Sequence, residues 1–195
     1  NIPMSGLTGQ LPTTWSAQAL RHLDVHENKL LGPLPSANLS DFEYLDLSKN
    51  SINGTLESIL SLTNLETLKL ASNKLSGALP ANLSSLGKLG HVDLSNNQLT
   101  VSLHVLTQLG KSLEYLDLSK NSINGTLESI LSLTNLETLK LASNKLSGTL
   151  PANLSSLGKL GHVDLSNNQL TVSLHVLTQL GKSLEYLDLS KNSIN

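Results

Sequence analysis

The strongest constraint on this chain is a long segment that it repeats almost unchanged. Residues 43–113 and 114–184 align with a shift of 71 positions and differ only where Ala78 corresponds to Thr149. Repetition at a fixed period indicates small units that stack, because one such unit cannot bury its own apolar face. The sequence therefore predicts one extended array over residues 1–195.

A shorter unit, L-x-x-L-x-L-x-x-N-x-L, recurs inside the long block every 22 to 24 residues. About eight such repeats are present, after a degraded unit with Ser5 in place of the asparagine. The motif asparagines are Asn28, Asn50, Asn73, Asn97, Asn121, Asn144, Asn168 and Asn192. In x-L-x-L-x the leucines alternate with other residues as in a strand, and stacked units would pair their strands in parallel. Each asparagine is expected to bond backbone groups within its own turn and in the next coil.

These units resemble leucine-rich repeat proteins, and segments such as "LTGQLP" from Leu7 and "LSGTLP" from Leu146 add the L-x-G-x-L-P signature of the plant-type subclass. That subclass includes receptor ectodomains, polygalacturonase-inhibitor-like proteins and some protist surface proteins. The resemblance implies a right-handed α/β solenoid with a parallel concave sheet, and short helical or 3-10 turns and loops on the convex side. "INGTLE" from Ile52 and "LTVSLH" from Leu99 depart from the signature.

Strand alternation assigns the third, fifth, seventh and eighth positions of each unit to the concave face. The same residue types return every third coil, about 14 Å apart for strands about 4.8 Å apart. Tyrosine or histidine beside aspartate suits sugars or basic peptide side chains. The candidate ligand-binding residues are His22, Asp24, His26, Tyr44, Asp46, Lys69, His91, Asp93, Tyr115, Asp117, Lys140, His162, Asp164, Tyr186 and Asp188.

Two functions fit such a face. The first is non-catalytic extracellular recognition or adhesion, in which the concave face binds a protein, a peptide or a glycan. The alternative is a structural surface glycoprotein, either a spacer or a self-assembling subunit, whose strand faces are polar only because they meet water.

Catalytic and metal chemistry find little support in the sequence. "HLDVH" (His22–His26) is the best metal candidate, because imidazole and carboxylate suit zinc, but its three side chains share one flat strand. No metal and no cofactor are therefore predicted. There is no cysteine nucleophile and no phosphate loop, and a solenoid face offers no oxyanion hole, so the chain is not expected to be an enzyme.

Composition and sequons favour an extracellular or cell-surface location. The net charge is −2 and no apolar run is long enough to span a bilayer, so neither nucleic-acid binding nor membrane insertion by this segment is expected. The sequons are at Asn38, Asn53, Asn82, Asn124 and Asn153. All five are expected to lie off the concave strands. The pattern starts and stops mid-unit, which predicts that terminal caps are missing from this piece of a longer protein.

Overall fold

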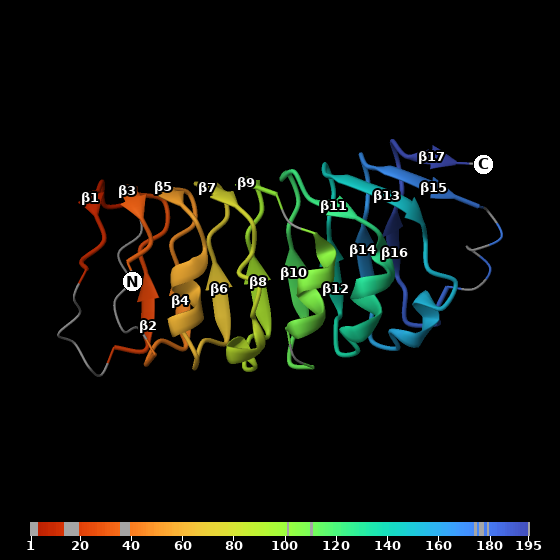
Figure 1. Ribbon diagram of the computed structural model, residues 1–195, viewed down its shortest axis with the longest axis horizontal. Coiled ribbons are helices and arrows are strands. Elements are labelled where there is room, and N and C mark those ends of the chain that lie inside the picture. Colours follow the sequence, from red (N-terminus) through yellow and green to blue (C-terminus); the bar gives the residue numbers. More distant parts are fainter. Residues whose placement is uncertain are drawn as a thin grey trace.

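The computed structural model describes residues 4–13, 20–35, 40–100, 102–109, 111–173, 175, 178 and 180–194 (Figure 1). Its coils stack side by side along one axis, and each coil contributes one strand to a long parallel sheet. The predicted repeat solenoid is confirmed, and no helix among these residues is long and apolar enough to cross a membrane.

The long sheet contains eight strands in sequential spatial order, from β2 at one edge to β16 at the other. Its members are β2 (His22–Asp24), β4 (Tyr44–Asp46), β6 (Thr67–Lys69), β8 (His91–Asp93), β10 (Tyr115–Asp117), β12 (Thr138–Lys140), β14 (His162–Asp164) and β16 (Tyr186–Asp188). The register is constant, so that Tyr115 pairs with His91 on one side and with Thr138 on the other. Equivalent positions of successive units therefore lie in straight columns across the sheet.

Short strands also line the edge of the solenoid where each coil leaves the motif asparagine. One sheet contains β1 (Thr8–Gln10), β3 (Lys29–Pro33), β5 (Ser51–Gly54), β7 (Lys74–Gly77) and β9 (Gln98–Leu99). The other contains β11 (Asn124–Gly125), β13 (Lys145–Thr149), β15 (Gln169–Val172) and β17 (Ser193–Ile194). Gly148 shows why the signature has glycine here: its φ is +83°, and a Cβ would lie 3.1 Å from Cγ2 of Thr126. Val172 takes the same position in β15, so glycine is preferred rather than obligatory.

Short 3-10 turns complete most coils opposite the long sheet. They are η1 (Glu57–Ser61), η2 (Ser84–Leu86), η3 (Leu103–Gln108), η4 (Leu127–Ser132) and η5 (Leu154–Ser156). Each turn buries one or two apolar side chains against the sheet, as η4 does with Leu127 and Ile130. The expected helical or 3-10 turns are thus present. Between the layers lies a continuous leucine core in which Leu68, Leu116 and Leu139 are at most 1% exposed.

The motif asparagines join each coil to the one before it. Nδ2 of Asn121 donates to the carbonyls of Leu118 (3.1 Å) and Ser119 (3.3 Å) in its own turn, and to Leu94 (3.0 Å) in the preceding coil. Its Oδ1 accepts the N–H of Leu99, also in the preceding coil, at 3.0 Å. The expectation that the asparagine bonds its own turn is confirmed, but the expected direction is wrong, since the second partner precedes it rather than follows it.

We expect Asn121→Ala to lower the free energy of unfolding by about 3 kcal/mol, because half-buried backbone groups in two coils lose their partner together. Urea denaturation followed by circular dichroism measures the change. Asn124→Ala is the matched control, because this asparagine is exposed on β11, and its effect should stay within about 0.5 kcal/mol. Equal losses in the two variants would contradict the structural role of Asn121.

Candidate functional site

The predicted columns lie on the side of the long sheet that faces away from the leucine core, and this side is called the column face. Third and fifth positions, such as Tyr115 and Asp117, are the first and last residues of each strand. The strands end there, whereas the alternation was expected to continue to the eighth position. All eight eighth-position residues instead have positive φ, between 53° and 57°. These residues turn the chain toward the motif asparagine, and they are Glu27, Lys49, Ser72, Asn96, Lys120, Ser143, Asn167 and Lys191.

Histidine and tyrosine rings stack in pairs across neighbouring coils of the column face. The ring centroids of His91 and Tyr115 are 4.1 Å apart with planes inclined by 2°, and His22–Tyr44 repeats this geometry. His162–Tyr186 forms the third stack, at 4.2 Å. Burial lowers the pKa of His91, and the nearby charge of Lys69 lowers it further, so this ring is neutral at neutral pH. The sequence predicted aromatic residues in this column, but not that they would pair with each other.

Lysine ammonium groups lie beside the tyrosine rings. Nζ of Lys69 is 5.4 Å from the ring centroid of Tyr44 and donates to its hydroxyl at 3.3 Å. Burial alone would lower the pKa of Lys69, but the Tyr44 hydroxyl and the charges of Asp46 and Asp93 outweigh it and raise that pKa. Nζ of Lys140 lies 5.5 Å from the Tyr115 centroid, so the arrangement repeats. Two of the three stacked ring pairs therefore have a lysine ammonium group beside the tyrosine.

The aspartates of the fifth column have a structural role that the sequence analysis missed. In all six, Oδ1 accepts the backbone N–H two residues later, as from Ser119 to Asp117 at 2.9 Å. The sequence does carry the signal: every aspartate in this column is followed at the seventh position by serine or histidine, and both lysines by alanine. One oxygen of each carboxylate thus holds the turn after its strand, and in Asp46 the other oxygen accepts the Tyr44 hydroxyl at 3.4 Å.

The aspartates also form neighbouring pairs on adjacent strands. Asp24 is the register partner of Asp46, Asp93 of Asp117, and Asp164 of Asp188. Lys69 separates the first pair from the second, and Lys140 separates the second from the third. The column is therefore acidic as predicted, with its negative charge arranged in pairs.

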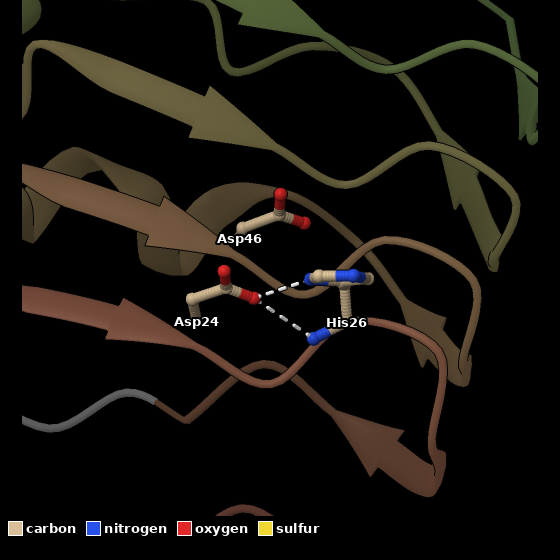
Figure 2. Close-up of side chains that lie close together, drawn as sticks. All are labelled: Asp24, His26 and Asp46. Atoms are coloured by element: carbon tan, nitrogen blue, oxygen red, sulfur yellow. Dashed lines mark hydrogen bonds and ion pairs between the residues drawn. The ribbon is translucent and has the colours of Figure 1, made fainter. Parts of the chain in front are cut away.

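The first aspartate pair differs from the others because His26 lies beside it (Figure 2). Nδ1 of His26 is 2.5 Å from Oδ1 of Asp24, and possible ligand atoms of Asp24, His26 and Asp46 all lie within 4.8 Å of one another. The sequence analysis grouped His22 with Asp24 and His26. Within the described residues, however, the third member is Asp46 from the next strand, while His22 stacks on Tyr44.

An open polar hollow of about 450 Å³ lies at the edge of the sheet where β8 and β10 begin. Its lining includes Gly90, His91, Tyr115, Lys88 and Lys111. His91 and Tyr115, which form one of the stacked ring pairs, both line this hollow. The lining also includes Glu66 and Glu114, so the hollow combines aromatic, basic and acidic groups.

Four of the five sequon asparagines lie within the described residues, and all four are exposed and outside the long sheet: Asn53, Asn82, Asn124 and Asn153. Asn53 is in β5 and Asn124 in β11, so they belong to the short edge sheets. Asn38 is outside the described residues. Glycosylation of these residues stays a prediction, and the column face contains none of the four.

Comparison with known proteins agrees with this architecture. The family model for the Leucine Rich Repeat matches residues 64–86, 112–133 and 135–157. The chain belongs to the leucine-rich repeat family. Receptor-like protein 39 of Arabidopsis thaliana is 36% identical over an alignment 195 residues long. The alignment covers 94% of this chain and 22% of that protein. This leucine-rich repeat chain thus spans less than a quarter of that curated relative.

Two solved structures show how closely the coils superpose on receptors. A TDR receptor has a TM-score of 0.87 at 28% identity, over 96% of this chain and 33% of that one. The Arabidopsis receptor kinase HAESA, in complex with the peptide hormone IDA and the co-receptor SERK1, has a TM-score of 0.82 at 32% identity. That match covers 96% of this chain and 32% of the receptor chain. The chain is therefore similar to about one third of a receptor ectodomain.

Neutralising Asp117 and neutralising its copy Asp188 should change the stability of the chain in opposite directions. Burial raises the pKa of Asp117, although the N–H of Ser119 opposes the rise, whereas the N–H of Ser190 lowers the pKa of Asp188 on the edge strand. Protonation of Asp117 stabilises the folded chain. This stabilisation is complete at pH values below the pKa of Asp117 in the unfolded chain, about 3.9, and it is lost as the pH rises through the pKa of Asp117 in the folded chain. For Asp188 the ionised form stabilises the folded chain. This stabilisation is present at pH values above the pKa of Asp188 in the unfolded chain and is lost as the pH falls through its pKa in the folded chain.

We therefore expect Asp117→Asn to stabilise the 195-residue chain at pH 7, with the difference vanishing near pH 3. Asp188→Asn should destabilise it at pH 7, because the ionised form is the one that is held. Urea denaturation at the two pH values measures both differences. The same sign for both variants at pH 7 would show that burial does not distinguish the two copies.

Proposed function

We propose that this chain is a non-catalytic recognition module that binds a protein or peptide across its column face. The observation that carries the proposal is the fixed alignment of stacked His–Tyr pairs, lysines and aspartate pairs along one sheet. Rigid aromatic groups supply contact area at low entropic cost, and charges at fixed positions give specificity. Packing and register position these groups before any ligand arrives, which lowers the entropic cost of binding.

The spacing of the columns favours an extended ligand. Three coils cover about 14 Å, because parallel strands lie about 4.8 Å apart. Four residues of an extended peptide cover about 13.6 Å at about 3.4 Å per residue. In a peptide lying across the strands, about every fourth residue would thus meet the same set of column-face side chains, one set for each three coils. The structure of HAESA in complex with the peptide hormone IDA supports a peptide as the first candidate.

Glycan binding, adhesion and self-assembly remain alternatives on the same face. A glycan would use the ring edges beside Gly90, and a spacer or assembly subunit would use the column face only as a solvated surface. The ring pairs on the column face favour recognition, because a spacer gains nothing from holding aromatic groups at its surface.

The binding test begins with peptides selected from a displayed random library on the immobilised chain. For a selected peptide, we expect Tyr115→Ala to weaken the affinity by about 1–3 kcal/mol, measured by isothermal titration calorimetry. Asp117→Asn should weaken binding of a basic peptide while keeping the acceptor that holds Ser119. Lys145→Ala, exposed on β13, is the control. Peptides whose affinity depends on Lys145 and not on Tyr115 would overturn the proposal.

We also propose that the chain lies outside the cell or on its surface, with glycans on the exposed sequon asparagines. The intact mass of protein from its native source should fall after enzymatic removal of N-glycans. Asn82 is one candidate, since it is exposed at the surface next to η2. An unchanged mass would contradict glycosylation and remove this support for the secretory route.

A further inference from the structure

We propose that Asp24, His26 and Asp46 form a binding site for a divalent metal ion, with zinc as the ion that their chemistry favours. The site lies at the β2–β4 end of the column face (Figure 2). It would hold an ion whether or not the face binds a peptide, so the inference does not depend on the proposed function.

The backbone brings the three groups together from two coils. Asp24 and Asp46 are register partners at the ends of β2 and β4, so their carboxylates leave the sheet side by side. His26 lies two residues beyond Asp24, and its ring returns toward the pair, with Nδ1 2.5 Å from Asp24 Oδ1. The possible ligand atoms lie within 4.8 Å of one another. Ligands about 2.0–2.2 Å from a tetrahedral zinc are separated by about 3.4 Å, so small side-chain rotations suffice.

Burial makes a cation favourable at this position. The exposed fractions of Asp24 and Asp46 are only 6% and 7%, so two carboxylates lie side by side with little access to water. A divalent ion would offset the charge of both carboxylates in a site that has little access to water. Oδ1 of Asp46 already accepts bonds from the N–H and Oγ of Ser48, and its Oδ2 accepts the Tyr44 hydroxyl at 3.4 Å. No donor among the described residues lies within hydrogen-bond distance of Asp24 Oδ2, and that oxygen is on the Asp46 side in Figure 2.

The donor set favours zinc over a harder cation. One imidazole nitrogen with two carboxylate oxygens suits zinc and other first-row metals, whereas calcium requires six to eight oxygens. Three protein ligands leave the fourth position of a tetrahedron to water. The His26 side chain is 31% exposed, so an ion can reach the site from solvent.

The repeats supply internal controls. The pair Asp93–Asp117 has the same strand register, but Ser95 takes the place of His26. Among the described residues, only the group with the histidine brings three potential ligands together. Serine follows the aspartate by two residues in five other coils, so His26→Ser introduces a residue that this turn already accommodates.

The experiment titrates the complete 195-residue chain, freed of metal by chelation and dialysis, with Zn²⁺ against a zinc-sensitive indicator at pH 7.5. We expect one zinc per chain. His26→Ser should weaken binding at least about tenfold. His22→Ala should bind like the wild type, because His22 stacks on Tyr44 and is not a ligand. Ser95→His should create a second site and raise the stoichiometry to two.

The absence of zinc binding by the wild type would overturn the inference. So would equal affinities of the wild type and His26→Ser, with circular dichroism showing that both are folded. Loss of zinc binding in His22→Ala would instead favour His22 over Asp46 as the third ligand and overturn the inference. Asp46→Asn distinguishes these cases, because it keeps the acceptor for Ser48 and should weaken zinc binding if Asp46 is a ligand.

Discussion

The structure depends on satisfying backbone polar groups between coils whose described residues form short strands and short 3-10 turns. Each coil places only three residues in the long sheet, so its strand alone leaves many N–H and C=O groups without partners. The motif asparagine fills this need by bonding carbonyls in two coils and accepting an N–H from the earlier one. Because the pattern recurs at every coil, the leucine core and the column register follow from it.

That register converts a one-dimensional repeat into a patterned surface. Residues separated by 22 to 24 positions in the chain become neighbours, and the three-coil period of the sequence becomes a spatial period across the sheet. The His–Tyr stacks and the lysines beside the tyrosines arise at these contacts. The fifth-column aspartates are part of the fold as well as of the column face, since one oxygen of each holds the turn after its strand. Part of the conspicuous acidic pattern is therefore structural, and a ligand would use what remains.

Departures from the repeat indicate where individual function can reside. Copies that differ only at Ala78 and Thr149 give the column face identical chemistry at successive steps, which suits an extended ligand. His26 breaks this identity beside a buried aspartate pair and adds a nitrogen donor that the other pairs lack. Asp117 and Asp188 are copies in sequence, yet their pKa values shift in opposite directions, because one is covered by a following strand and the other is on the edge strand.

The sequence by itself determined the unit length, the buried leucines, the asparagine positions and the membership of the third and fifth columns, because these depend on periodicities within one coil. It also determined the glycine turns, since Gly148 has a backbone conformation that favours residues without a Cβ. Only the tertiary structure decided that Asn121 bonds the preceding coil, that His91 stacks on Tyr115, and that Asp46 rather than His22 completes the group with Asp24 and His26. Each of these contacts joins different coils, and its partner is fixed by the register and side-chain rotamers of the stacked strands, which no pattern within one coil specifies.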